Sequence, residues 1–472
     1  MATQSKPQTL AEVLLRYKWR YILGILSLIL TDLLQQVLPK LTGNFFQDLS
    51  DNVLNAHGLL RYAGLMIGTA VVIGAFRLTW RLGVFGTARM VEQDVRSAYF
   101  AHLEKLPASF YHQHKTGDLM AMATNDLQAV RGIAGDGILF ATDSLMMTIL
   151  TLGSMILTVG WRLSVLALLP LPILAVFAGF FGKMMHTRSR AVQDAFGKIS
   201  DVTQENISGM RVVKAFDQEA TEEAKFDAAN RNYVARFMSM MRIQGALDPT
   251  IGVLAGICFM LALLFPGRAV LTGELKLGAF ISLTMYINML IWPMLAGGWV
   301  INTIQRGMGA YDRIRSVLLE EPDVATADKA VLPAEGAVAG QIEIRNLTFT
   351  YPGQQQPALS GLNVTVRPGE TLGILGKTGS GKTTLVSLLA RVFNPPEGTV
   401  FMDGIDVLKL PLDVLRQSIA FVPRESFLFS RTVGENIGFA PGDWAEEQVR
   451  HAAQTAQVEQ DILEFLPHGY ET

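Results

Sequence analysis

The sequence predicts a multi-domain fold: an all-α domain of six membrane-spanning helices with long cytoplasmic extensions, followed by an incomplete α/β domain. Two observations predict it. Half of the 472 residues are hydrophobic and only 17% are charged, with the deficit of charge concentrated in the first 310 residues; soluble globular chains carry about a quarter charged residues. Residues 376–383 read Gly-Lys-Thr-Gly-Ser-Gly-Lys-Thr, a complete match to the phosphate-binding loop G-x-x-x-x-G-K-[ST].

Six apolar stretches are long enough to cross the hydrocarbon core of a bilayer, which takes about 20 helical residues. The first is not a typical signal peptide, because it exceeds an h-region, contains Asp32 and Pro39, and is followed by further spans. The predicted spans are residues 21–46, 59–86, 138–160, 163–182, 247–272 and 278–304.

Lysine and arginine are concentrated on one side of these spans. The N-terminal arm and the connections 87–137 and 183–246 are rich in basic residues, whereas the other three connections hold Arg162, Arg268 and Lys276 between them. Basic connections stay on the cytoplasmic side of a membrane. The sequence therefore predicts a multi-pass protein of the cell inner membrane whose N-terminus and C-terminal domain are both cytoplasmic.

The two long connections do not read as loops. Residues 87–106 and 183–246 are polar, rich in helix-forming residues and nearly free of proline. This pattern predicts that the spanning helices continue into the cytoplasm. Short segments at 109–126 and 205–216 are where the chain is expected to bend back toward the membrane.

Four charged residues fall inside the predicted spans: Asp32, Arg77, Arg81 and Asp143. Each would cost about 2.5–3.5 kcal/mol near the bilayer centre if unpaired. Arg77 and Arg81 are four residues apart and share a helix face. They could line a water-filled substrate cavity or pair with a carboxylate, or both could lie at the cytoplasmic end of a long helix, already in water.

Overall charge and cysteine content exclude other classes of protein. The net charge of −2 gives no electrostatic case for a nucleic-acid partner. The single cysteine, Cys258, cannot form an internal disulfide, and its apolar surroundings favour a role in packing.

The composition changes after the last span. Residues 317–340 read as a linker with acidic residues, alanines and prolines, which divides a membrane domain at 1–316 from an α/β domain at 341–472. Within the second domain, a strand running directly into the glycine-rich loop and then a helix is the context that the phosphate-binding motif requires. The expected strands are residues 342–351, 362–366 and 371–375, and the expected helix is 382–393.

The glycine-rich loop has a specific chemistry. Its glycines permit backbone angles that turn successive N–H groups toward phosphate oxygens, and the following helix N-terminus adds partial positive charge. Lys382 is expected to reach the β- and γ-phosphates of ATP, and the hydroxyl of Thr383 is expected to coordinate Mg²⁺. A plain glycine-rich turn with a solvated lysine would not explain the complete spacing. The candidate nucleotide-binding residues in this loop are Gly376, Lys377, Thr378, Gly379, Ser380, Gly381, Lys382, Thr383 and Thr384.

Several further motifs accompany the loop and the six spans. The chain resembles the half-transporters of ATP-binding-cassette (ABC) exporters, in particular the bacterial heterodimeric multidrug-exporter type, over essentially its whole length. The motifs that carry the resemblance are Gly117-Asp118-Leu119-Met120, Thr124-Asn125-Asp126, Val212-Val213-Lys214-Ala215-Phe216, Asp248-Pro249-Thr250 and Ile291-Trp292-Pro293-Met294.

The resemblance implies roles for particular residues. Tyr351 stands 25 residues before Gly376, where the family has an aromatic residue that stacks on adenine, although an ordinary strand aromatic is the alternative. Segments 109–126 and 205–216 are similar to the coupling helices that pass force between the membrane and nucleotide-binding domains. The resemblance also implies that Ser426–Ser430 and Glu435–Ile437 are the surface which those helices contact.

Two positions depart from the family pattern. Where the family places a glutamine that helps to hold Mg²⁺ and the attacking water, this chain has Arg424, followed by Glu425. An arginine cannot coordinate a metal. This departure puts ATP hydrolysis at the site in doubt but does not exclude ATP binding. Glu425 could take the place of the glutamine only after a small shift. Met122 stands where the family often has arginine.

The resemblance also implies what would follow residue 472. The family continues into its signature loop, the acidic Walker B strand that supplies the catalytic glutamate, and the switch histidine. None of these three is present, so residues 341–472 are expected to be the N-terminal part of a nucleotide-binding domain, in an incomplete half-transporter whose catalytic residues lie beyond Thr472.

The expected function is ATP-driven export of an amphipathic small molecule across the inner membrane, by a dimer of this chain with a second, different half-transporter. Export of a lipid or a peptide is the nearest alternative, and the spans do not decide among these substrates or show which residues line a cavity. Arg424 and the missing catalytic half favour a non-transporting regulatory subunit that binds nucleotide in the membrane. A soluble ATPase is excluded by the six spans.

Overall fold

The computed structural model describes residues 9–326, 331–332, 338–423, 426–439 and 445–472. These residues form two compact units. The first comprises Met1–Leu106 with Phe110–Pro322, and the second comprises Pro107–Ser109 with Asp323–Thr472. A helical unit followed by a smaller unit with a sheet agrees with the predicted fold class. The predicted domain boundaries and the linker at 317–340 stay predictions.

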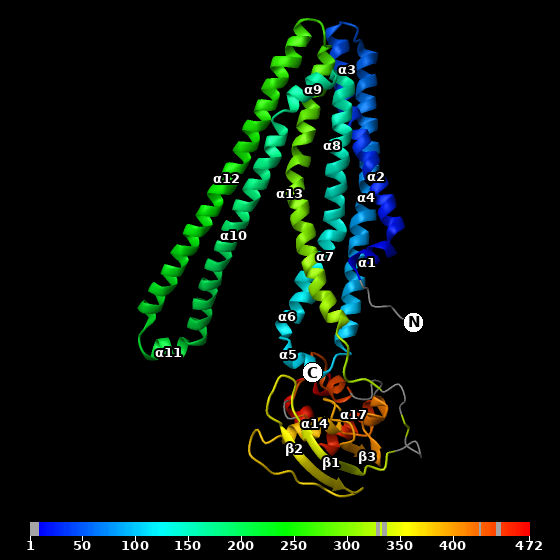
Figure 1. Ribbon diagram of the computed structural model, residues 1–472, viewed down its shortest axis with the longest axis vertical. Helices are drawn as coiled ribbons and strands as arrows, with labels where there is room; N and C mark the ends of the chain where they lie inside the picture. Colours follow the sequence, from blue (N-terminus) through cyan, green and yellow to red (C-terminus); the bar gives the residue numbers. More distant parts are fainter. Residues whose placement is uncertain (1–8, 327–330, 333–337, 424–425, 440–444) are drawn as a thin grey trace. The chain divides into compact units, whose positions relative to one another are not determined.

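The first unit is helical among its described residues (Figure 1). Its helices differ greatly in length, and the longest are more than twice what a membrane requires. They are α1 (Leu10–Arg16), α2 (Lys18–Gln35), α3 (Val37–Ser50), α4 (Ala56–Leu103), α5 (Ala108–Gln113), α6 (Thr116–Ala121), α7 (Leu127–Gly132), α8 (Ile138–Val159), α9 (Trp161–Leu168), α10 (Leu171–Ser208), α11 (Met210–Ala215), α12 (Glu219–Leu271) and α13 (Leu277–Leu319), with π-helical turns at Met122–Asp126 and Ile133–Gly137.

Five helical stretches among the described residues are long and apolar enough to cross a membrane. They correspond to the first, second, third, fifth and sixth predicted spans. The predicted span at 163–182 instead runs across the end of α9 and the start of α10, which are separated by a turn at Leu169–Pro170. The five stretches are Lys18–Ser50, Ala56–Leu103, Thr116–Val159, Glu219–Leu271 and Leu277–Leu319.

The long helices extend well beyond the apolar segments. The 53 residues of α12 would measure about 80 Å at 1.5 Å per residue, against about 30 Å of hydrocarbon. Helices α10 and α12 pack side by side, and the short helix α11 joins their ends (Figure 1). Three apolar side chains at α11, Met210, Val212 and Phe216, are nevertheless exposed.

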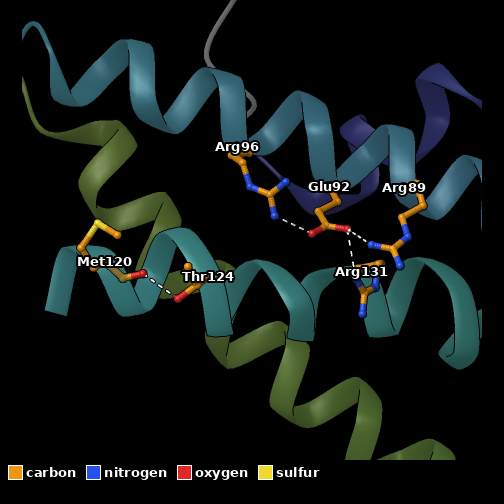
Figure 2. Close-up of polar contacts among 6 residues, drawn as sticks. All are labelled: Arg89, Glu92, Arg96, Met120, Thr124 and Arg131. Carbon is orange, nitrogen blue, oxygen red and sulfur yellow. Dashed lines mark hydrogen bonds and ion pairs between the residues drawn. The ribbon is translucent and has the colours of Figure 1, made fainter. Parts of the chain in front are cut away.

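A charged cluster fastens α4 to α7. The carboxylate of Glu92 is buried and accepts from Arg96 at 2.5 Å, from Arg89 at 3.3 Å and from Arg131 of α7 at 3.3 Å (Figure 2). Because the three guanidinium groups are partly exposed and the carboxylate is not, the arginines compensate the desolvation of Glu92 while keeping contact with water.

The second unit contains a four-stranded sheet in the order β2–β1–β3–β4. Antiparallel pairing sets Ile342 opposite both Val366 and Met402. The elements are β1 (Ile342–Phe349), β2 (Leu359–Val366), α14 (Lys382–Leu389), β3 (Val400–Met402), β4 (Ile405–Asp406), α15 (Leu412–Gln417), α16 (Val433–Ile437), α17 (Glu446–Thr455), α18 (Glu459–Phe465) and a 3₁₀ turn at Gly469–Glu471.

The predicted strand at 371–375 is wrong. These residues form no ladder with any described strand, and the side chain of Leu375 is 98% exposed. A strand needs a neighbour for its N–H and C=O groups, and an apolar run such as Leu372–Leu375 needs cover on both faces. The predicted helix also ends early, at Leu389, where Arg391 adopts a positive φ of 48°.

Candidate functional site

The glycine-rich loop lies directly before α14, and two of its glycines have backbone angles that other residues avoid. Gly379 has a φ of 83° and Gly381 a φ of 85°. At Gly381 a Cβ would also lie 2.6 Å from the carbonyl oxygen of Ala358 and 2.7 Å from the Cδ2 atom of Leu359. Glycine at this position is therefore required twice, by backbone conformation and by space.

Lys382 closes the loop on itself. Its Nζ donates hydrogen bonds to the carbonyl oxygens of Gly376 at 2.7 Å and Lys377 at 2.8 Å. The ammonium group therefore lies inside the turn of the loop, although the loop is exposed. A phosphate group would offer this lysine charged acceptors in place of neutral carbonyls, and hydrogen bonds between charged partners are the stronger kind.

The first turn of α14 presents two threonines in different ways. The side chain of Thr383 is exposed, whereas Thr384 is buried. The first N–H groups of a helix have no partner within it and carry partial positive charge. The exposed residues 376–380, the N-terminus of α14 and the Thr383 hydroxyl are thus brought together, and this set of donors fits a Mg²⁺-bound polyphosphate.

Tyr351 is joined to the same helix. Its hydroxyl lies 2.9 Å from the hydroxyl oxygen of Thr384, and its half-buried ring packs edge-on against Phe349 and Phe393 at centroid distances of 5.1 and 5.2 Å. Sequence reasoning missed this bond, because nothing in the spacing of residues 351 and 384 indicates it. The role of Tyr351 in stacking on adenine stays a prediction.

Two family models match most of the chain. The model described as "ABC transporter transmembrane region" matches residues 21–294, and the model described as "ABC transporter" matches residues 359–468. The first covers more than half of the chain and the second contains the phosphate-binding loop.

The chain belongs to the ABC transporter family.

Relatives with the same two-part organisation are similar over nearly all of the chain. The "Probable multidrug resistance ABC transporter ATP-binding/permease protein YheI" of Bacillus subtilis is 37% identical over 97% of this chain and 77% of the relative. The "Multidrug resistance-like ATP-binding protein MdlA" of Escherichia coli is also 37% identical, with the same coverage. The "ATP-dependent lipid A-core flippase" of Syntrophus aciditrophicus is 32% identical over 80% of this chain and 62% of the relative.

These matches confirm the resemblance to an ABC exporter half-transporter. The chain is a multi-pass membrane protein that joins a transmembrane region to an ATP-binding domain, and it belongs to ATP-hydrolysing transporters that drive export. ATP is the nucleotide that this domain binds.

The position of the departure from the ABC pattern, Arg424, lies outside the described residues, as does Glu425. The segment that follows is described. Asn436 holds it in place by accepting from the Phe429 N–H at 2.9 Å and donating to the Phe429 carbonyl at 3.1 Å. Phe427 and Leu428 are about three-quarters exposed, so this segment presents apolar side chains on the surface of the second unit.

A buried arginine behind the loop was not singled out from the sequence. Arg391 follows α14 and donates to the carbonyl oxygens of Ala325 at 2.9 Å and Val407 at 3.3 Å. Burial lowers the pKa of Arg391, and the nearby charge of Arg416 lowers it further. The positive φ of Arg391 and its buried hydrogen bonds show that it fixes the end of α14 to the rest of the second unit.

Proposed function

We propose that the chain is one subunit of a dimeric exporter that carries amphipathic small molecules out of the cytoplasm across the inner membrane. The observation that carries the proposal is a phosphate-binding loop, with no room for a side chain at Gly381, on the same chain as the membrane spans. Relatives named for multidrug resistance support a small-molecule substrate. The relative named as a lipid A-core flippase keeps a lipid as the second candidate.

Residues 376–384 and Tyr351 form the proposed ATP site. The N–H groups of the loop and of the first turn of α14 would hold the phosphates, and Lys382 would exchange its two loop carbonyls for phosphate oxygens. Thr383 would ligate Mg²⁺, and Tyr351 would lie against adenine. Bound ATP supplies the free energy of phosphoryl transfer, while the residues of this chain orient it.

The proposed partner is a second half-transporter of different sequence. The exposed apolar side chains of α11, at the end of the α10–α12 pair, are suited to dock on a nucleotide-binding domain. Such contacts would convert closure of the nucleotide-binding domains into opening of the membrane domain toward the outside. The basic connections support a cytoplasmic location for the N-terminus, for α11 and for the second unit.

A regulatory role without transport is the rival function, and one residue favours it. Arg424 stands where a neutral metal and water ligand is expected, and its charge beside Mg²⁺ would oppose hydrolysis while leaving ATP binding possible. We expect Arg424→Gln to raise the ATPase rate of the assembled dimer. An unchanged rate would show that Arg424 does not limit hydrolysis.

Transport in vesicles tests the proposal. Inverted membrane vesicles containing this chain and its partner should accumulate a fluorescent amphiphile when ATP is added. Lys382→Ala should abolish accumulation, whereas Lys409→Ala, which removes an exposed lysine remote from the loop in sequence, should preserve it. ATP binding without ATP-dependent movement of any amphiphile would favour the regulatory function.

A further inference from the structure

Three guanidinium groups from two helices are held in one place by a buried carboxylate. Glu92 accepts one hydrogen bond each from Arg89 and Arg96 of α4. It accepts another from Arg131 of α7 (Figure 2). The side chain of Glu92 is only 6% exposed, whereas the three arginine side chains are between 32% and 68% exposed. In this arginine cluster Glu92 therefore lies behind the guanidinium groups and fixes their positions, while the groups themselves stay accessible.

The arginine cluster carries more positive charge than Glu92 neutralises. Its ion pairs join three guanidinium groups to one carboxylate, which leaves two positive charges. The next carboxylate along α4, Asp94, lies on another face of the helix and accepts from the Tyr17 hydroxyl at 2.8 Å. Each guanidinium group has five N–H donors, and within the described part of the chain each gives one of them to Glu92. Surplus donors and surplus positive charge fit an anion with several oxygen atoms.

Neighbouring residues place the arginine cluster at the level of the lipid headgroups. The second predicted span ends at residue 86, so Glu92 follows it by less than two turns of α4. Beside Glu92, the Sδ atom of Met90 accepts from Nη1 of Arg20 at 2.7 Å. Trp19, next to Arg20 in the chain, is 74% exposed, and tryptophans are enriched where a span meets the headgroup layer. With the N-terminus in the cytoplasm, as proposed, the arginine cluster lies beside the phosphates of the cytoplasmic leaflet.

Two of the arginines continue an exposed apolar stripe of α4. Val71, Leu78 and Leu82 lie in the predicted span and are 67%, 61% and 69% exposed. Residues seven apart on a helix are displaced by only about 20° around its axis, so the apolar stripe runs on from Leu82 to Arg89 and then to Arg96. One face of α4 thus offers apolar side chains within the hydrocarbon and oriented guanidinium groups at its cytoplasmic end. A phosphate group attached to acyl chains matches both parts.

We infer that Arg89 and Arg96, positioned by Glu92, bind the phosphate group of an anionic phospholipid of the cytoplasmic leaflet. The acyl chains of this lipid lie along the apolar stripe. A zwitterionic headgroup fits less well, because it brings its own cation next to two surplus positive charges. The lipid is a resident component of the transporter and not its cargo. The inference therefore depends on the proposed orientation in the membrane but not on the proposed transport.

Measurement of bound lipid tests the inference. The purified chain in a neutral detergent is titrated with dioleoylphosphatidylglycerol or dioleoylphosphatidylcholine, and bound lipid is counted by native mass spectrometry. Phosphatidylglycerol should bind more tightly. Arg89→Gln and Arg96→Gln should each weaken its binding by about fivefold, which is the contribution of one basic residue to the binding of anionic lipid. Binding of phosphatidylcholine should change less. Unchanged binding of phosphatidylglycerol in both variants would overturn the inference.

Arg188→Gln is the matched control. Arg188 is an exposed arginine of α10 that follows the fourth predicted span by six residues, and it belongs to a helix that contributes nothing to the arginine cluster. Its substitution should leave the binding of phosphatidylglycerol unchanged. A loss as large as that of the Arg89 variant would show a general attraction of anionic lipid to basic residues, and the inference would fail.

Three further results would contradict a resident lipid at this place. Equally tight binding of dihexanoylphosphatidylglycerol would show that the apolar stripe holds no acyl chain. Release of the lipid when ATP is added to the assembled dimer would make the lipid a cargo. Disappearance of the site when a second half-transporter binds would show that this face of α4 is a subunit interface. Loss of transport with lipid binding retained would instead overturn the proposed function alone.

Discussion

The phosphate-binding loop and the charged cluster of the spans are built in opposite ways. The loop is nine consecutive residues, 376–384. Their spacing and glycines define a phosphate-binding site, provided that a helix follows the loop. The cluster joins Asp32, Arg77 and Asp143, which are separated by 45 residues or more and meet only when α2, α4 and α8 pack. A local site can be recognised from its motif, whereas a cluster of residues distant in the chain has no motif and depends on tertiary packing.

Substitution of Gly381 is expected to cause the largest loss of nucleotide binding at the phosphate-binding loop. Gly381→Ala places a Cβ 2.6 Å from the Ala358 carbonyl oxygen in a backbone with a φ of 85°, so the loop must move. We expect at least a tenfold loss of affinity for a fluorescent ATP analogue, measured by titration.

Gly379→Ala is the matched comparison for that loss. Gly379 has nearly the same φ, 83°, but no atom within 4 Å of its Cβ position. Backbone strain then costs about 1–2 kcal/mol and no clash is added. Equal losses in the two variants would show that strain, and not the contact with Ala358, makes glycine necessary.

Substitution of Arg391 tests how far the second unit depends on hydrogen bonds that lie outside the phosphate-binding loop. Arg391→Met removes buried hydrogen bonds to Ala325 and Val407 and leaves their carbonyls unsatisfied. We expect a loss of about 2–3 kcal/mol in the stability of the second unit, followed by thermal unfolding. Arg416→Met, which removes one hydrogen bond made by an exposed side chain, should cost less. Full stability in the Arg391 variant would mean that the end of α14 needs no such anchor.

Substitution of Glu92 tests how much a buried charged contact stabilises the helical unit. Glu92→Gln removes the one carboxylate that three arginines share (Figure 2), with an expected cost of about 1.5–3 kcal/mol. Arg89→Gln should cost under about 0.5 kcal/mol, because that side chain is 68% exposed and its pair with Glu92 is screened by water. Thermal unfolding in detergent compares the two, and similar losses would contradict a central role for Glu92.

Substitution of Tyr351 should cost less stability than loss of Arg391 or Glu92, and its two variants separate two possible roles of the side chain. Tyr351→Phe removes the 2.9 Å bond to Thr384 and keeps the ring, so stability should fall by about 0.5–1.5 kcal/mol with little change in ATP affinity. Tyr351→Leu removes the aromatic face and should weaken ATP binding if the ring stacks on adenine. Equal ATP affinity in both variants would exclude that stacking.

The failure at 371–375 shows what a local pattern omits. An alternating or apolar run predicts a strand on the assumption that a neighbouring strand exists. Among the described residues none pairs with it, and Leu375 is left exposed. Two of the four paired strands, β1 and β2, were predicted to within a few residues.

The sequence by itself determined five of the six predicted spans, the long helical extensions, the phosphate-binding loop and the family, because each depends on residues close together in the chain. Only the tertiary structure decided that Tyr351 reaches Thr384, and that Arg131 of α7 reaches Glu92 of α4. It also brought Asp32 together with Asp143. These contacts depend on which helix faces pack, and side chains that are distant in the chain become neighbours only after burial of the apolar surfaces has fixed that packing.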